Sequence, residues 1–281
     1  MKVSIIGHGF VGKALDNSLN HDIEKLIIDP IYKNDVSDIA DFIPEIIFIC
    51  VPTPMKDDGG QDLDILNEVI KDIKKIKLDT QVVLKSTVLP NHILDIKNLF
   101  PSIVYNPEFL TEINAFEDFI NADLIVLGGD NASTSEISSF YTNQTKCITD
   151  NHIITDLISA SLIKYTINCF LASKVIFFNE LHDVFKNSGT NETWENFVKA
   201  ISLDTRMGKS HMQVPGPDGR YGFGGACFPK DSQALYEYSL LLKTPLQVLK
   251  KVMDINNEIR GSYENTKARE AKQNINFSSK D

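Results

Sequence analysis

A strand, a glycine motif and a helix open the chain, and together they restrict its fold more than any other feature. Residues 2–6 have the pattern of a buried strand, GHGFVG follows at 7–12, and residues 13–19 favour a helix. Glycines at these spacings permit a tight turn, close approach of a pyrophosphate and close packing of helix on sheet. The helix N-terminus favours negative charge. We therefore expect a dinucleotide-binding turn.

An acidic residue follows the second expected strand. Residues 25–28 (KLII) form an apolar run that ends at Asp29. This lies within the distance expected for the acid that hydrogen-bonds a ribose 2′-hydroxyl, and a carboxylate there disfavours a 2′-phosphate. Asp29 therefore predicts NAD rather than NADP as the cofactor. The alternative is a turn residue at the end of a strand, before Pro30.

Further apolar runs alternate with helical stretches. Strands are expected at 46–49, 81–84, 103–105 and 124–127, and a helix at 64–76. Pro52 and Pro54 must take the chain out of the sheet at the carboxyl end of a strand, where ligands of open α/β sheets bind. The alternation predicts a Rossmann-like, doubly wound parallel sheet of the α/β class.

The second half favours helices. Residues 153–185 are apolar on more than one side, so a helix there must be widely buried, in the monomer or against a second copy. Helical patterns recur at 193–200 and 246–259. We expect an NAD-binding domain at 1–150, a helical dimerisation domain with the cysteine loop at 151–262, and a polar tail at 263–281.

A glycine-rich loop, GFGGACFPKD at 222–231, brings Cys227 to the start of an expected helix that Asp231 or Ser232 could cap. Its glycines would let the backbone approach a ligand. A thiol near a helix N-terminus and beside Lys230 should have a lowered pKa, which favours the nucleophilic thiolate. Cys227 is therefore a candidate covalent catalyst, and the alternative is an inert buried cysteine.

Two pairs of polar residues have helical spacing. Lys164 and Asn168 interrupt an apolar helix four residues apart, so both would project from one face. They could stabilise an oxyanion, or form a solvated stripe. Glu108 and Glu112 have the same spacing and on a helix could both point into a cleft. Taken alone, two surface carboxylates are the simpler interpretation.

Composition limits the partners and the compartment. The net charge of −10 argues against nucleic acid or an anionic membrane as the main partner. We expect no signal peptide, because a strand and the glycine motif follow Met1 directly, and no membrane span. Four widely spaced cysteines without a CxxC motif suggest neither a disulfide framework nor a metal site. A cytoplasmic location is therefore expected.

Several of these motifs occur together in one known family. The sequence resembles the UDP-glucose/GDP-mannose dehydrogenase family, nearest to the UDP-glucose 6-dehydrogenases, over residues 1 to about 260. The resemblance rests on GHGFVG at 7–12, VPTPMKDDGGQDL at 51–63, STV at 86–88, NPEFLTE at 106–112, the Lys164/Asn168 pair and GFGGACFPKD at 222–231. In this order and spacing the set is highly specific.

The resemblance implies oxidation of a nucleotide-sugar primary alcohol to a carboxylate with two NAD. Cys227 would add to the aldehyde and then carry a thioester, which holds the intermediate between two cofactor turnovers. Lys164 and Asp231 would stabilise oxyanions and position water, and Asn168 would donate a hydrogen bond. Glu108 would act as the base for hydrolysis and Thr87 would help to orient water.

The resemblance also implies residues for the cofactor and the substrate. Those expected at NAD are Gly7, Gly9, Phe10, Val11, Gly12, Asp29, Thr53, Thr87 and Glu112. Those expected at the sugar nucleotide are Glu108, Phe109, Leu110, Lys164, Asn168, Arg206, Tyr221, Phe223 and Gly224. The helix at 153–185 resembles the family's dimer-forming helix and so predicts a homodimer.

The sequence departs from the family at its end. Family members continue beyond residue 281 with another α/β domain that grips the nucleotide part of the substrate. The identity of the sugar nucleotide is therefore open, and remote binding energy is often needed at the reacting centre. Two alternatives follow: an NAD-binding or partner-dependent module with weak catalysis, and a one-step dehydrogenase that uses only Lys164 and Asn168.

Overall fold

The computed structural model describes residues 1–265 and 267–277. The chain forms two compact units. Unit 1 comprises Met1–Thr53 and Asp62–Lys164, and unit 2 comprises Pro54–Gln61 and Tyr165–Asp281. The division therefore falls inside one helix, α7 (Leu157–Asn187), whose first residues belong to unit 1.

Unit 1 is built on a seven-stranded sheet with the order β2-β1-β3-β4-β5-β6-β7. The strands are β1 (Lys2–Ile6), β2 (Glu24–Ile28), β3 (Ile46–Ile49), β4 (Gln81–Leu84), β5 (Val104–Tyr105), β6 (Ile125–Gly128) and β7 (His152–Thr155). All neighbouring strands pair in parallel except β5 and β6, which pair antiparallel. Because β2 and β3 lie on opposite sides of β1, the strand order reverses there, and such a switch point is where open α/β sheets bind ligands.

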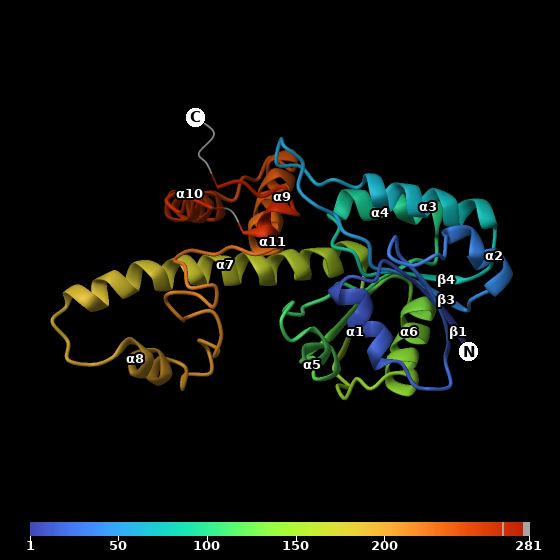
Figure 1. Cartoon of the computed structure of the whole chain (residues 1–281), viewed down its shortest axis with the longest axis horizontal. Helices are drawn as coiled ribbons and strands as arrows, with labels where there is room; N and C mark the ends of the chain where they lie inside the picture. Colours follow the sequence, from blue (N-terminus) through green and yellow to red (C-terminus); the bar gives the residue numbers. More distant parts are fainter. Residues whose placement is uncertain (266, 278–281) are drawn as a thin grey trace. The chain divides into compact units, whose positions relative to one another are not determined.

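Helices cover both faces of this sheet (Figure 1). One face carries α1 (Phe10–Ser18), α5 (Ala115–Ile120) and α6 (Asn131–Gln144), and the other carries α2 (Ile39–Phe42), α3 (Asp64–Ile76) and α4 (Pro90–Leu99), with the short 3-10 turn η1 (Val36–Asp38) before α2. Successive residues of β3 enter opposite cores, Phe48 with α1 and Ile49 with α3, because side chains alternate along a strand. The predicted Rossmann-like, doubly wound class is confirmed.

Several predicted elements have the observed bounds, others differ by one to three residues at their ends, and one predicted helix start is wrong. Strands β1, β3 and β4 and helix α3 begin and end where the sequence pattern predicts. The predicted start of a helix at Ile153 is wrong, because His152–Thr155 forms β7 and pairs with β6. The helix starts after Asp156, whose side chain accepts the backbone N–H of Ser159 at 2.9 Å. Two adjacent β-branched isoleucines favour the strand.

Unit 2 is helical. It contains α7 from Tyr165 onward, α8 (Trp194–Ile201), α9 (Phe228–Leu241), α10 (Gln247–Gly261) and the short α11 (Ala268–Ala271). Phe223 packs between α7 and α10 in one buried cluster, and Trp194 packs against Phe178 in a second. By length and composition α7 could cross a membrane, and half of its most apolar stretch is buried. Core helices of soluble proteins meet the same criterion, so this is weak evidence for a membrane span.

Residues 263–265 and 267–277, expected to belong to a polar tail, are part of unit 2. Glu270, Ile275 and Phe277 are buried, and Asn274 donates a hydrogen bond of 3.0 Å to the carbonyl of Met55. Residues 266 and 278–281 lie outside the part of the chain that the structure describes. Polar composition therefore did not prevent this segment from packing, because three buried side chains anchor it.

Candidate active site

The three motif glycines in the turn after β1 have distinct surroundings. A methyl group on Gly7 would lie 2.8 Å from the carbonyl of Cys50, and one on Gly12 would lie 2.0 Å from the Gly7 oxygen. Nothing lies within 4 Å of a methyl group on Gly9. Gly7 and Gly12 thus serve the turn and the packing, and Gly9 leaves open space in which a dinucleotide phosphate fits.

The first turn of α1 is available to an anion. Its N-cap, Gly9, makes no side-chain cap, and no acidic residue lies in the turn that begins with Phe10 and Val11. Asp29 follows β2 and accepts the backbone N–H of His8 at 2.7 Å. The acid is therefore tied to the glycine turn, in the place where a ribose hydroxyl is recognised in such folds. These residues fit an NAD molecule.

The carboxyl ends of β3 and β4 are tied together by their polar residues. Thr53 is buried, and its hydroxyl donates to the backbone oxygen of Thr87 at 2.8 Å. The hydroxyl of Ser86 donates to the oxygen of Val51 at 2.7 Å. Both candidate NAD residues, Thr53 and Thr87, therefore lie at one edge of the sheet, as their positions at strand ends predict.

Glu108 and Glu112 do not share a helix. No helix forms between β5 and α5 at these positions, and Pro107 follows directly after Asn106 at the end of the strand. Glu112 is exposed in a bend, whereas Phe109 and Leu110 pack partly against the two cores of unit 1. The helical spacing of the two carboxylates therefore had no structural meaning.

Glu108 instead belongs to a buried polar cluster that the sequence analysis missed. Its Oε2 lies 2.7 Å from the Nζ of Lys85, which also donates to Asn106 Oδ1 at 2.8 Å and to the Tyr141 hydroxyl at 3.1 Å. Burial opposes the positive charge of Lys85, but the attraction of Glu108, Tyr141 and Cys50 together with the hydrogen bond to Glu108 outweighs it, so the pKa of Lys85 is raised above its usual value. A charged residue directly after the apolar strand β4 was the available signal.

Lys164 makes contact with the same segment. It is 5% exposed, its Nζ donates to the backbone oxygen of Glu108, and it lies 5.3 Å from the centre of the Phe109 ring. Its ammonium is thus held in unit 1 by a carbonyl and an aromatic face. Lys164 is therefore a buried cation and not part of a solvated stripe.

Within unit 2, Asn168 and Asp231 are paired. Asn168 Nδ2 donates to Asp231 Oδ2 at 2.6 Å, and Lys230 Nζ contacts the other carboxylate oxygen. All three side chains are buried. The prediction that Asp231 or Ser232 caps the helix is wrong, because α9 begins at Phe228 and its N-cap is Cys227. Asp231 lies in the first turn, where its carboxylate is committed to these two partners.

The cysteines differ in their surroundings. Burial raises the pKa of Cys50 and of Cys169 to about 12, so neither is a nucleophile near neutral pH. Burial also raises the pKa of Cys147. Cys227 is half-buried at the start of α9 and is not in a disulfide. Cys227 therefore differs from the other three cysteines in its place at a helix N-terminus.

The glycines before Cys227 are used mainly for packing. A methyl group on Gly222 would lie 2.6 Å from Asn256 Oδ1, and one on Gly224 would lie 1.6 Å from Arg260 Nη2. Asn256 also bonds both backbone groups of Phe223, at 2.7 Å and 3.0 Å. Of these glycines, Gly225 alone leaves open space, with a φ of 80°. Side chains of α10 therefore hold most of the loop.

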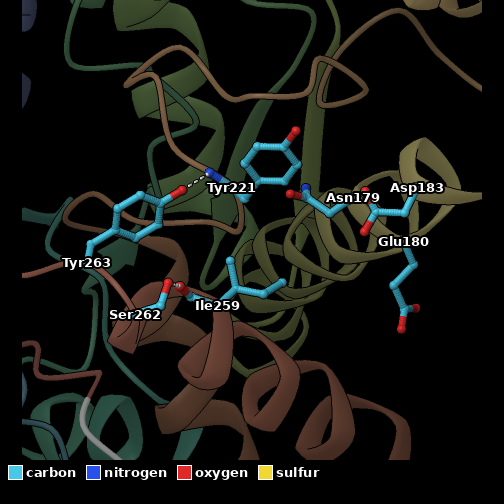
Figure 2. Close-up of a pocket in the computed structure, with 7 residues that line it drawn as sticks. All are labelled: Asn179, Glu180, Asp183, Tyr221, Ile259, Ser262 and Tyr263. Carbon is cyan, nitrogen blue, oxygen red and sulfur yellow. Dashed lines mark hydrogen bonds between the residues drawn. The ribbon is translucent and has the colours of Figure 1, made fainter. Parts of the chain in front are cut away.

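A cavity of about 320 Å³ lies beside the start of this loop (Figure 2). Its lining comes from α7, the loop and the end of α10: Asn179, Glu180, Asp183, Tyr221, Ile259, Ser262 and Tyr263. The Tyr263 hydroxyl accepts the backbone N–H of Tyr221 at 2.9 Å. Hydroxyls, carboxylates and aromatic rings suit a neutral, hydroxyl-rich ligand such as a sugar ring.

Arg206, which the family resemblance places at the substrate, lies at the surface beside Asp204. Its guanidinium is held by Asp204 at 2.6 Å, and its side chain is 87% exposed. Among residues 1–265 and 267–277, no three His, Cys, Asp or Glu side chains are grouped in a way that could hold a metal ion.

Comparison with known proteins identifies two domains of one family. Residues 31–144 match the NAD binding domain of the UDP-glucose/GDP-mannose dehydrogenase family, and residues 158–258 match its central domain. The cofactor of the N-terminal domain is therefore NAD.

Named relatives agree with this assignment. The chain is 38% identical to a UDP-glucose 6-dehydrogenase of Rickettsia bellii over 79% of its length, and 34% identical to the putative UDP-glucose 6-dehydrogenase YtcA of Bacillus subtilis over 94%. It spans 50% and 69% of those two proteins. The structure of a UDP-glucose dehydrogenase from Pyrobaculum islandicum superposes with a TM-score of 0.77 at 26% identity, covering 92% of this chain and 68% of that one.

The two matched domains include the 51–63 and 106–112 motifs, the Lys164/Asn168 pair and the cysteine loop. The alignment with YtcA extends over 94% of the chain at 34% identity. The chain therefore belongs to the UDP-glucose/GDP-mannose dehydrogenase family.

Proposed function

We propose that this chain carries out NAD-dependent oxidation of the primary alcohol of a UDP-glucose-like nucleotide sugar to the uronic acid, through a covalent intermediate on Cys227. The observation that carries the proposal is the position of Cys227. It is the half-buried N-cap of α9, and Asp231 in the first turn of that helix is paired with Asn168 of α7. A thiol at a helix N-terminus is favoured as thiolate.

The residues divide into those that bind and those that react. Gly7, Gly9, Gly12 and Asp29 would hold NAD, with the open N-terminus of α1 at its phosphates. NAD, when bound, accepts a hydride in each of the two oxidations. Cys227 would add to the aldehyde carbon, and after the second oxidation its sulfur would carry the acyl group as a thioester.

Lys164 and Asp231 would stabilise oxyanions and position water, and Asn168 would donate a hydrogen bond, in the roles that the family resemblance assigns to them. Glu108 would take the proton of the attacking water, and Thr87 would help to orient that water. The water oxygen forms a bond to the acyl carbon, the bond from that carbon to sulfur breaks, and the electron pair stays on Cys227. The products are the carboxylate and the regenerated thiol.

The cavity beside Tyr221 is the candidate subsite for part of the sugar nucleotide. Its hydroxyls and aromatic rings suit a sugar ring, and its carboxylates, Glu180 and Asp183, would repel a phosphate. Further candidate substrate contacts are those expected from the family: Glu108, Phe109, Leu110, Arg206, Phe223 and Gly224. The buried side chain of Phe223 limits its part to shaping the loop.

A homodimer through α7 is part of the same proposal. Phe170, Phe177 and Val184 repeat every seventh residue along α7 and are 67%, 58% and 64% exposed. Such a stripe suits a second helix, because apolar residues at this spacing share one face. We place the protein in the cytoplasm, where its four cysteines, which form no disulfide, would stay reduced.

A second candidate function is an NAD-binding module that depends on a partner for catalysis. The chain spans 50% of one named relative and 69% of another. A module of this kind would bind NAD by itself but form NADH only after a partner is added.

The deciding experiment counts NADH formed per carboxylate. Purified protein is mixed with NAD and a panel of UDP- and GDP-sugars, with Cys227→Ser in parallel. Two NADH per carboxylate, with the variant unable to form carboxylate, is the expected result. NAD binding without NADH from any sugar would favour the module, and full activity of Cys227→Ser would favour a one-step dehydrogenase.

A further inference from the structure

Lys85 is a buried residue to which neither the predicted chemistry nor the family resemblance gave a role. Lys85 follows β4, its side chain is 1% exposed, and its Nζ faces the carboxylate of Glu108 at 2.7 Å. An ammonium has three N–H donors. The ammonium of Lys85 has three acceptors within reach: Glu108 Oε2, Asn106 Oδ1 and the Tyr141 hydroxyl.

The acceptors are themselves fixed. The Tyr141 hydroxyl donates to Asn106 Oδ1, and Asn106 Nδ2 donates to the backbone oxygen of Val126 at 2.9 Å. The rings of Phe119 and Tyr141 lie 5.3 Å and 5.7 Å from the ammonium. The cavity at this point has a volume of only about 10 Å³. Lys85 therefore has one position, set by β5, β6 and α6, and so does the carboxylate oxygen that it contacts.

Glu108 keeps capacity for another partner. Its Oε1 accepts a hydrogen bond of 3.0 Å from the backbone N–H of Phe109, and its Oε2 contacts the Nζ of Lys85. A carboxylate has about four acceptor sites, so it can still accept from a water molecule. The backbone of Glu108 is also held, because Lys164 Nζ donates to its oxygen. Both the main chain and the side chain of Glu108 are thus fixed by buried lysines.

We propose that Lys85 is a positioning residue for thioester hydrolysis, which holds the Glu108 carboxylate in the orientation in which it takes the proton of the attacking water. This rests on the proposed function, because Glu108 is the base of that reaction. Lys85 itself touches neither substrate nor cofactor in this role. The two hydride-forming steps do not use Glu108 as a base, so loss of Lys85 should spare them.

The test separates hydrolysis from oxidation. Lys85→Met, Glu108→Gln and wild-type protein are mixed rapidly with NAD and the sugar nucleotide that wild type oxidises. NADH is followed by absorbance, and the mass on Cys227 by intact mass spectrometry. Lys85→Met and Glu108→Gln should each release two NADH per chain in a burst, then turn over at least tenfold more slowly than wild type, with the acyl group on Cys227.

Lys75→Met is the matched control. Lys75 also lies 2.7 Å from a carboxylate oxygen, that of Asp72, but its side chain is 76% exposed. It should behave as wild type. Lys85→Arg keeps the charge but not the three-acceptor geometry, and should recover part of the hydrolysis rate. If Lys85→Met shows no cooperative thermal unfolding, Lys85→Arg decides, and it must accumulate more acyl-enzyme than wild type.

The outcomes distinguish the two proposals. Wild type that forms two NADH per carboxylate, with Lys85→Met slowed equally in the burst and afterwards and no acyl group on Cys227, would overturn the role of Lys85 alone. The same holds if the folded Lys85 variants match Lys75→Met. Wild type that forms no NADH from any sugar nucleotide would overturn the proposed function, and the role of Lys85 with it.

Discussion

Asn168 donates a hydrogen bond of 2.6 Å to Asp231 from 63 residues away, and so joins α7 to the first turn of α9, directly after Cys227. Both side chains are buried. Because Lys230 contacts the second carboxylate oxygen, the orientation of Asp231 depends on one neutral and one charged partner. The candidate nucleophile is thus followed by a fixed carboxylate.

Replacement of Asn168 by alanine should lower kcat by about 100-fold, the typical cost of losing an oxyanion donor. NAD affinity should not change, because the candidate NAD residues belong to unit 1. Steady-state kinetics and NAD titration measure the two effects. Ser173→Ala, on the same helix, removes a hydroxyl that bonds only the Cys169 backbone oxygen among the described contacts, and serves as control. An unchanged kcat in Asn168→Ala would contradict the role.

The motif glycines should separate folding from cofactor binding. Gly12→Ala places a methyl group 2.0 Å from the Gly7 oxygen and should lower the free energy of unfolding by about 1–3 kcal/mol. Gly9→Ala meets nothing within 4 Å, so its thermal midpoint should match wild type while NAD affinity falls at least tenfold. Calorimetry and NAD titration test this. Wild-type NAD affinity in Gly9→Ala would show that the cofactor lies elsewhere.

Thiol labelling should select Cys227. Burial raises the pKa of Cys50 and Cys169 to about 12, so at pH 8 roughly one thiol in 10⁴ is thiolate at each. Native protein treated with iodoacetamide and digested should carry label on Cys227 first, and on Cys50 and Cys169 only after unfolding in urea. Protection by NAD with substrate would strengthen the assignment. Label on Cys169 before Cys227 would count against it.

The same buried thiols predict a loss of stability in alkali. Their folded pKa of about 12 lies above the ordinary value of 9.0, so the neutral form is favoured in the folded state. This stability is fully present below pH 9 and is lost as the pH rises towards 12, by at most about 1.4 kcal/mol per pH unit for each thiol. The free energy of unfolding of wild type and Cys169→Ala is measured in urea at pH 8, 9 and 10. It should fall less steeply with pH in the variant than in wild type. Equal slopes would exclude Cys169 as a contributor.

The dimer proposal predicts a defined change in mass. Phe177→Asp places a charge in the middle of the α7 stripe and should weaken association at least tenfold, because central aromatic residues carry most interface energy. Light scattering should report a dimer for wild type and a monomer for the variant at low micromolar protein. Val248→Asp, on α10 at a position that is 76% exposed in wild type, should remain a dimer. Monomeric wild type would refute the proposal.

The sequence by itself determined the local elements and the cofactor turn. Strands β1, β3 and β4 and helix α3 follow from apolar periodicity, and the close packing at Gly7 and Gly12 follows from the spacing of the motif. These features depend on residues within one turn or strand, so a local pattern is sufficient. The motif set was also enough to identify the family, because it samples both matched domains.

Only the tertiary structure decided which polar groups meet. Lys85 contacts Asn106, Glu108 and Tyr141, which lie 21, 23 and 56 residues away in the sequence. The sequence around any one of these residues does not indicate that it contacts the others. In the same way, Gly222 and Gly224 leave room for side chains of α10. Glu108 and Glu112 have helical spacing but lie in a segment without a helix. Such contacts depend on the order of strands and the packing of helices over them. That order is fixed by burial across the whole unit, and not by the residues beside each site.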